Sequence, residues 1–282
     1  MSSICEICSA PMQNYSLDNN NVLYKCTKCR HITRDLSVSD CNSREQAWGG
    51  SGLFDKLRNY LAFKSIVKKS ITNSEHVFEI GFGSGWLLKQ FLKIGKKIAG
   101  VDKETLKVYI EEDVTKNGEI FFGNAEDFQI PNEKYDLVLA IHLVEHLIDV
   151  KKVFKSAYDG LKKGGSFYIM TPSGDSDGLK LFKTAWWNLE DPTHIRFFSE
   201  KSIRIALEQA GFKKITINKS LLDSMTVEVN SFIRLFYAPK GKNGILSGKL
   251  IMVLDLLLLM PFMLLRLLFP KMRSTIEIIA EK

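Results

Sequence analysis

Residues 77–88 read VFEIGFGSGWLL, a run that starts apolar, turns through three glycines and ends apolar. Glycine allows the backbone to adopt a positive φ, and it lets a ligand approach without meeting a Cβ. The apolar residues after Gly85 predict a helix, whose first backbone N–H groups would point at such a ligand. The run therefore predicts a buried strand, a ligand-binding turn at Gly81, Gly83 and Gly85, and a helix.

Strands and helices alternate outward from this turn. The next apolar run, KIAGVD, ends at Asp102, and an acid at that position can accept hydrogen bonds from ribose hydroxyls. Such alternation predicts a mainly parallel sheet with helices on both faces. We expect strands at 76–80, 97–102, 119–122, 135–141, 166–171 and 214–219. We expect helices at 53–71 and at about 85–94, 104–115, 150–161 and 199–210.

The glycine spacing narrows the ligand class. The dinucleotide fingerprint is G-x-G-x-x-G, which would indicate a nicotinamide enzyme. This chain instead has E-x-G-x-G-x-G from Glu79, which resembles motif I of the class I S-adenosylmethionine-dependent methyltransferases. The resemblance continues over most of residues 50–282, including YDLVLAIHLVEHLID, LKKGGSFYIMTPS and HIRFFSEKSIRIALEQAGF. It implies a Rossmann-like seven-stranded sheet of order 3-2-1-4-5-7-6 and S-adenosylmethionine as cofactor.

The resemblance also implies a set of cofactor contacts. NAEDF (124–128) follows the expected third strand, where the family contacts adenine. Asn124 and the backbone of Ala125 would hold the base edge, with Glu126 or Asp127 nearby. The implied cofactor residues are Glu79, Gly81, Gly83, Gly85, Asp102, Asn124, Ala125 and Glu126.

Candidate catalytic residues should follow the fourth and fifth strands, because ligands in open α/β sheets bind beyond the carboxyl ends of the strands. HLVEH supplies His142, Glu145 and His146, and the later DPTHIRFF supplies His194. A histidine can take a proton from a hydroxyl near neutral pH, so His142 and His194 are candidate general bases. Glu145 and His146 are either catalytic or hold this loop in place.

A second metal site is a further possibility in HLVEH. The quinone-pathway O-methyltransferases, which this region resembles, carry Glu-x-x-Glu-His there as metal ligands. Here His142 replaces the first glutamate, and imidazole suits Mg²⁺ less well than a carboxylate. We therefore expect no metal at this position.

Aromatic residues flank His194 in the sequence. Two interpretations remain open for them: they line a substrate pocket or cover the sulfonium, or they pack in a core. The residues are Trp186, Trp187, Phe197 and Phe198.

The N-terminal region carries two cysteine pairs, CEIC (Cys5, Cys8) and CTKC (Cys26, Cys29), with seventeen residues between them. Each pair can chelate from one tight turn, and four thiolates satisfy tetrahedral Zn²⁺. A module of about 34 residues buries too little surface to fold without such a metal cross-link. The sequence thus predicts a structural zinc ribbon, in which His31 is a bystander.

These patterns predict a domain organisation. The zinc ribbon covers 1–34, a polar linker that contains Cys41 covers 35–51, and the methyltransferase domain covers 52–282. The ribbon resembles one that precedes the catalytic domain in several sugar and small-molecule methyltransferases and in one type of ribosomal RNA guanine methyltransferase. It would shape the acceptor pocket, bind a partner or stabilise the N-terminus.

An apolar insertion at about 240–272 includes ILSGKLIMVLDLLLLMPFMLLRLLFP (245–270), which is long enough to span a bilayer. STIEIIAEK (274–282) fits the family's last strand, between the fifth and sixth, so both ends of the insertion would return to one domain. That excludes a single crossing. An interfacial helix, a shallow hairpin bent at Pro261, or a helix buried against the domain or a second copy remain. Six basic residues suit an anionic lipid surface: Lys240, Lys242, Lys249, Arg266, Lys271 and Arg273.

The charge balance bounds the surroundings of the protein. A formal net charge of +7 and a pI near 9.0 favour nucleic acid, a phosphorylated substrate or an anionic membrane. The N-terminus, MSSICEICSA, lacks the apolar core of a secretory signal, so we expect a cytoplasmic protein with reduced thiols. We expect it to be peripheral at the inner face of the cell membrane.

The expected function is methyl transfer from S-adenosylmethionine to a small or lipid-linked acceptor, with O-methylation favoured. A sugar or surface-polysaccharide precursor is the first acceptor class and an isoprenoid quinone the second. A ribosomal or other RNA methyltransferase is the alternative, but no basic patch interleaved with aromatics appears, which argues against a nucleic-acid partner. A catalytically inactive cofactor- or partner-binding protein is the remaining alternative.

Overall fold

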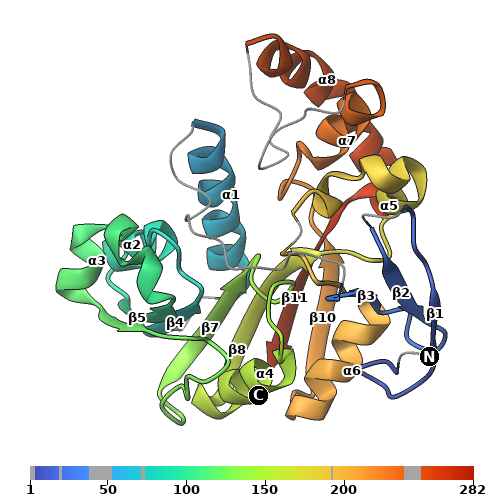
Figure 1. Ribbon diagram of the computed structural model, residues 1–282. Coiled ribbons are helices and arrows are strands. Elements are labelled where there is room, and N and C mark those ends of the chain that lie inside the picture. The colour runs from blue at the N-terminus through green and yellow to red at the C-terminus, as the bar shows by residue number, and fades with distance from the viewer. Residues whose placement is uncertain (1–3, 19–20, 38–52, 71–73, 192, 238–248) are drawn as a thin grey trace. The chain divides into compact units, whose positions relative to one another are not determined.

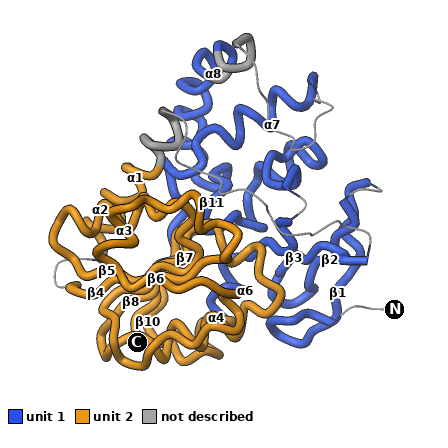
Figure 2. Tube along the Cα trace, turned by 60° about the vertical axis from the view of Figure 1, so that its left-hand side comes forward, with its two compact units in different colours: residues 1–42, 171–205, 218–276 blue, residues 43–170, 206–217, 277–282 orange. Residues whose placement is uncertain are grey.

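A computed structural model describes residues 4–18, 21–37, 53–70, 74–191, 193–237 and 249–282. The chain forms two compact units that interleave along the sequence (Figure 2). The cysteine unit comprises residues 1–42, 171–205 and 218–276. The sheet unit comprises residues 43–170, 206–217 and 277–282.

A seven-stranded sheet has the order β10-β11-β8-β7-β4-β5-β6 (Figure 1). Five strands pair in parallel, in the order β8-β7-β4-β5-β6. The strand over the last residues lies between β8 and β10, as predicted, and the order confirms the expected 3-2-1-4-5-7-6. The strands are β4 His76–Ile80, β5 Lys97–Asp102, β6 Glu119–Phe122, β7 Tyr135–Ile141, β8 Leu161–Pro172, β10 Lys214–Lys219 and β11 Thr275–Glu281.

Helices cover both faces of this sheet, because successive side chains of a strand point to opposite faces. Leu137 and Leu139 of β7 belong to a buried cluster with residues of three helices on one face. On the other face, Phe167 of β8 packs against Phe154 of α4, with ring centroids 5.8 Å apart. The helices of the first face are α1 Leu53–Ser70, α2 Trp86–Lys93 and α3 Glu112–Asn117, and α4 is Val150–Gly160.

One expected helix is wrong as a single element. The segment 104–115 forms a 3₁₀ helix, η1 (Glu104–Tyr109), and then α3. Ile110 and Glu111 between them are extended. Ile110 packs against the buried cluster, and the backbone N–H of Glu111 donates to the carbonyl of Ser84 at 2.9 Å. These contacts outside the segment outweigh its local helical pattern.

The cysteine unit contains a second sheet, of order β1-β2-β3-β9. β1 (Met12–Asn14), β2 (Leu23–Cys26) and β3 (Ile32–Arg34) form an antiparallel meander, and β3 pairs with β9 (Arg196–Phe197). The N-terminal strands therefore share a sheet with a segment from much later in the chain. The predicted boundaries at 34 and 52 stay a prediction, and most of the expected linker lies outside the described residues.

The aromatic residues near His194 pack in the core of the cysteine unit. Trp186, Phe197 and Phe198 are fully buried, and the rings of Trp186 and Phe197 lie 5.3 Å apart. Trp187 is half-buried against the same cluster. Of the two interpretations left open for these residues, the core position is the one observed. The surrounding elements are α5 Asp177–Phe182, η2 Lys183–Ala185, η3 Trp187–Leu189, α7 Val227–Phe236 and η4 Pro270–Met272, and α6 Glu200–Ala210 runs on into the sheet unit.

The apolar insertion forms helix α8 (Lys249–Leu268), with Pro261 inside it, and residues 240–248 lie outside the described part of the chain. Arg266 of this helix is fully buried, and its Nη1 donates to the carboxylate of Glu228 at 2.5 Å. The guanidinium also donates to the carbonyls of Ser220, Asp223 and Ser224. Among the described residues, no helix has both the length and the apolarity that a membrane crossing needs.

The expectation that six basic residues near the insertion face anionic lipid is wrong for two of them. Arg266 does not face lipid, because Glu228 and three carbonyls engage its guanidinium inside the cysteine unit. Arg273 is half-buried and donates to the carbonyls of Arg266 and Lys219 at 3.0 Å. Lys271 is exposed.

Candidate cofactor site and metal centre

Three adjacent strands end at one edge of the large sheet. β4 leads into Gly81, β5 ends at Asp102 and β7 leads into His142. β4 lies between β5 and β7 and pairs with both in parallel, so the three carboxyl ends meet. This is the edge where open α/β sheets bind ligands.

The glycine turn has the backbone that its sequence predicts. Gly81, Gly83 and Gly85 have φ values of +74°, +56° and +74°. A Cβ on Gly81 would lie 2.8 Å from a side-chain carbon of Leu143, whereas a Cβ on Gly83 would meet no atom within 4 Å. Gly83 thus faces open space, which a side chain would fill and a bound cofactor can occupy.

Asp102 holds this turn in place. One carboxylate oxygen accepts a hydrogen bond from the N–H of Gly83 at 2.6 Å, and the other accepts one from the N–H of Lys103 at 2.7 Å. Burial raises the pKa of Asp102, and these two donors oppose that shift. A carboxylate has about four acceptor positions, so capacity for ligand hydroxyls remains.

Glu79 lies one strand residue before the turn and is buried. Among the described residues, its Oε2 has no hydrogen-bond partner. Burial, and then the nearby charge of Asp102, raise the pKa of Glu79 to about 8. The carboxyl therefore keeps its proton at neutral pH, and a cation bound at this edge would favour its ionised form. Together with the open side of Gly83, this orphaned acid fits a cationic cofactor.

The turn after β6 contains the predicted adenine segment. Asn124 is exposed, and its side-chain oxygen accepts a hydrogen bond from the N–H of Glu126 at 3.3 Å. The carboxylate of Glu126 accepts hydrogen bonds from the N–H groups of Ile148 and Asp149 at 2.7 and 2.9 Å. Glu126 thereby ties this turn to the loop after β7, a role the sequence did not indicate. The adenine contacts of Asn124, Ala125 and Glu126 stay a prediction.

His142 follows β7 with an unusual backbone. Its φ is +51°, which side chains other than glycine rarely adopt. Its N–H donates to the carbonyl of Met170 at 2.8 Å, and its Nδ1 lies 3.4 Å from Oε1 of the fully buried Glu145. His146 closes the same turn, donating its N–H to the carbonyl of Leu143 at 2.9 Å. Strained residues of this kind concentrate at functional sites.

His194 belongs to the cysteine unit, whereas His142, Glu145 and His146 belong to the sheet unit. The Nδ1 of His194 lies 2.7 Å from the carbonyl oxygen of Asn188. A carbonyl can only accept, so Nδ1 carries the proton and, in the neutral ring, Nε2 holds a lone pair. Nε2 lies 3.9 Å from a carboxylate oxygen of Asp191, which would stabilise an imidazolium. This tautomer is the one a general base needs.

Arg34 supports the loop that carries His194, a role that no sequence pattern indicated. The buried guanidinium donates to the carbonyl of His194 at 3.2 Å and to the carbonyl of Leu189 at 3.1 Å. Its backbone N–H donates to the carbonyl of Ile195 at 2.8 Å. A strand of the cysteine-bearing region therefore positions a candidate catalytic residue.

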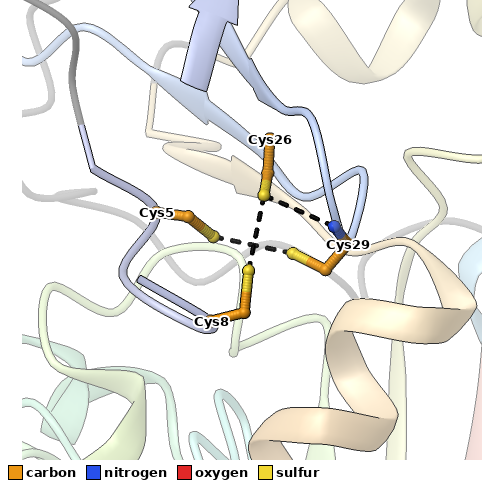
Figure 3. Close-up of side chains that lie close together, drawn as sticks. All are labelled: Cys5, Cys8, Cys26 and Cys29. Carbon is orange, nitrogen blue, oxygen red and sulfur yellow. Dashed lines mark hydrogen bonds between the residues drawn. The ribbon is translucent and has the colours of Figure 1, made fainter. Parts of the chain in front are cut away.

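The four N-terminal cysteines converge from two turns (Figure 3). The Sγ atoms of Cys5 and Cys29 are 3.6 Å apart, those of Cys8 and Cys26 are 3.4 Å apart, and all four lie within 4.8 Å of one another. Tetrahedral zinc with Zn–S bonds of about 2.3 Å requires sulfur separations of about 3.8 Å. The donor set and its spacing fit structural Zn²⁺.

Burial opposes the ionisation of thiols in this cluster. It raises the pKa of Cys5 to about 11 and also raises that of Cys29. Burial opposes ionisation of Cys26 as well, but N–H groups of Cys29 and Lys28 donate to its sulfur and lower its pKa to about 7. A bound cation would stabilise the ionised form of these buried cysteines.

A charged network surrounds the cysteine cluster. Glu6, between the first two cysteines, accepts two hydrogen bonds at 3.0 Å from the guanidinium of Arg196 in β9. His31 is fully buried, with Nε2 2.8 Å from the same carboxylate and its ring 4.9 Å from that of Phe198. His31, expected to be a bystander, thus has a structural role. Cys41 lies outside the described residues.

The sheet order and the glycine turn define the class I S-adenosylmethionine-dependent methyltransferase fold. The family model for the methyltransferase domain matches residues 51–217, more than half of the chain, and the chain belongs to this family.

Similar proteins agree with this assignment. An uncharacterized methyltransferase of Bacillus subtilis strain 168 is 28% identical over 159 residues, 53% of this chain and 63% of that protein. A ubiquinone biosynthesis O-methyltransferase of Coxiella burnetii is 22% identical over 130 residues, 44% of this chain and 56% of that protein. The match thus spans less than two thirds of each relative. An S-adenosylmethionine-dependent methyltransferase of Mesorhizobium loti shares the fold, with a TM-score of 0.55, 14% identity and coverage of 81% of this chain and 100% of that one.

Gly83→Ala should abolish binding of S-adenosylmethionine, because the added Cβ would enter the open side of the turn. Gly95→Ala is the matched control, since Gly95 also has a positive φ (+77°) and no atom within 4 Å of an added Cβ. Both variants carry similar backbone strain, so only Gly83→Ala should lose affinity in calorimetric titration. Equal affinities for the two variants would contradict the cofactor position.

The purified protein should contain one zinc ion per chain by elemental analysis. Cys26→Ser should lose it and lower the melting temperature by about 10 °C or more, since the metal supplies folding energy. Cys41→Ser serves as the control and should keep both metal and stability. Retention of zinc by Cys26→Ser, or its absence from the wild type, would refute the metal centre.

Proposed function

We propose that this protein transfers the methyl group of S-adenosylmethionine to an oxygen of a small or lipid-linked acceptor, working at the inner face of the cell membrane. A sugar or surface-polysaccharide precursor is the favoured acceptor, and an isoprenoid quinone the second choice. The observation that carries the proposal is the open glycine turn at Gly83, held by Asp102 and followed by the start of α2.

In this proposal the turn binds the cofactor. The backbones of Gly81, Gly83 and Gly85 permit its close approach, and Asp102 accepts hydrogen bonds from the ribose hydroxyls. Glu79 gives up its proton and pairs with the positive charge, which the orphaned, buried position of its Oε2 supports. Asn124 and the backbone of Ala125 hold the base edge, while Glu126 keeps their turn in place.

S-adenosylmethionine supplies an electrophilic methyl group on a sulfonium. The protein aligns the acceptor hydroxyl with it, excludes water, and removes the hydroxyl proton through a histidine. His194 is suited to this role by the lone pair on Nε2 and by the Asp191 carboxylate 3.9 Å from that nitrogen, which would stabilise the imidazolium. His142 is the second candidate, with Glu145 orienting its ring and His146 holding the turn.

The acceptor class rests on features outside the cofactor turn. The same fold serves O-, N- and C-methylation, so membership of the family does not choose among them. The similarity to a ubiquinone biosynthesis O-methyltransferase over 44% of this chain, and two candidate histidine bases, support an oxygen acceptor. The exposed apolar side chains of α8 support an acceptor that resides in a membrane.

The proposed zinc ion supports the acceptor side of the enzyme. The carbonyl of Cys29 accepts a hydrogen bond from the hydroxyl of Ser199 at 2.5 Å, and Glu6 pairs with Arg196. Arg196 and Ser199 both lie just after His194 in the chain. The metal would thereby stabilise the segment that carries this histidine, and the role fits the first of the three suggested for the ribbon.

Methyl-labelled S-adenosylmethionine should transfer its label to a membrane lipid extract, in an assay that offers the lipid extract and total RNA separately. His142→Ala or His194→Ala, whichever removes the base, should lower turnover by about 100- to 10,000-fold with cofactor affinity unchanged. His76→Ala is the control, because His76 lies at the opposite end of β4 and pairs with Asp136 at 3.5 Å.

The outcomes of this assay separate the possible functions. Label in RNA alone would replace the proposal with RNA methylation. Cofactor binding without transfer to any fraction would favour an inactive binding protein. Full turnover in both histidine variants would remove the histidine base from the mechanism.

A further inference from the structure

Helix α8 exposes an apolar face over the side chains that the structure describes. Among the helix side chains that the structure describes, every exposed one is apolar, and Leu257 and Met260 are 68% and 74% exposed. The exposed large apolar residues of the helix are Val253, Leu256, Leu257, Met260, Leu264, Leu265, Leu267 and Leu268. A helix on a water-facing surface normally points its polar residues outward.

The charged Arg266 side chain of this helix points away from the exposed apolar face, into the cysteine unit. Arg266 is buried, and its guanidinium donates hydrogen bonds to Glu228 and to three backbone carbonyls of the same unit. Phe262 packs inward as well, with its ring 5.7 Å from that of Phe232 in α7. One side of α8 is thus fixed to the cysteine unit by an ion pair and a core contact, and the described side chains on the other side are all apolar.

The end of α7 adds to the exposed apolar surface. Leu235, Phe236 and Tyr237 are all exposed, and the ring of Phe236 lies 5.3 Å from that of Phe232. Phe269 follows α8 directly and is exposed too. Aromatic residues with one polar end, such as Tyr237, are enriched where hydrocarbon meets water.

The composition of the face decides what covers it. Protein interfaces carry roughly one hydrogen bond per 100–200 Å². Among the side chains of α8 that the structure describes, the exposed ones offer no group that could form such a bond. Hydrocarbon matches such a surface and a second protein does not.

We infer that α8 lies along the surface of a lipid bilayer, with this face inserted into the edge of the hydrocarbon and its Arg266 side held by the cysteine unit. The inference deepens the proposed function, on which it rests for the idea of a membrane acceptor. Arg266 and Arg273 are engaged internally, so neither supplies an attraction to anionic lipid, and we take apolar contact as the main attraction.

Vesicle flotation tests this surface with the full-length, zinc-containing protein. Phosphatidylcholine vesicles without anionic lipid, at about 0.15 M ionic strength, should carry the wild type upward. A triple variant, Leu257→Glu, Met260→Glu and Leu264→Glu, should reduce the bound fraction about tenfold or more. Leu181→Glu is the matched control, because Leu181 is a 61% exposed leucine on α5; this variant should float like the wild type.

Each other outcome overturns the inference. Flotation that needs anionic lipid would assign membrane contact to basic residues, and equal flotation of the triple variant would place it elsewhere. Light scattering without vesicles should show a monomer, whereas a dimer that the triple variant dissociates would make a second copy the occupant.

Control measurements on the same variants distinguish a failure of the membrane inference from a failure of the proposed function. An unchanged zinc content and melting temperature in the triple variant show that the cysteine unit is folded, and loss of either would require flotation to be repeated with the single Met260→Glu, which must then fail to float. Unchanged affinity for S-adenosylmethionine shows that the cofactor site is intact. A wild type that floats but binds no cofactor would refute the proposed function and leave the membrane surface intact.

Discussion

The parallel pairing of β4 with β5 on one side and β7 on the other is the constraint on which the rest of the cofactor site depends. It brings the glycine turn, Asp102 and the loop of His142 to one edge although they are distant in sequence. The carboxylate of Asp102 then fixes the turn by accepting the N–H of Gly83. A shift of one residue in this register would turn Glu79 to the opposite face of the sheet and separate it from that edge.

In the cysteine unit, a small set of contacts joins the N-terminal strands to a segment much later in the chain. The N-terminal strands are short, the four cysteines converge beside them, and the Glu6–Arg196 ion pair connects this region to β9. Arg34 then reaches the backbone around His194. The N-terminal region is therefore built into the segment that carries a candidate base, and it is not a separate appendage to that segment.

Local patterns predicted most of the fold. Apolar runs bounded by turn residues located β4, β5, β6, β7 and β10 with the bounds observed. The resemblance to the class I methyltransferases implied the sheet topology. The cysteine spacing predicted the cluster at Cys5, Cys8, Cys26 and Cys29. The signal for each strand and for each cysteine pair lies within a few residues of the chain.

What the sequence missed depends on partners far along the chain. The break between η1 and α3 follows from the bond between Glu111 and Ser84, and the burial of Arg266 depends on Glu228. The roles of Arg34 and Glu126 depend likewise on backbone groups of distant loops. A single sequence carries no pattern for such contacts, because each is fixed by the assembled structure.

Hydrogen–deuterium exchange with and without S-adenosylmethionine reads the backbone of the proposed cofactor site. We expect slower exchange of the amides at 81–85 and 124–126 on binding, with the amino ends of β4 and β5 unchanged. Binding that leaves the glycine turn unprotected, or that protects only the cysteine unit, would contradict this expectation.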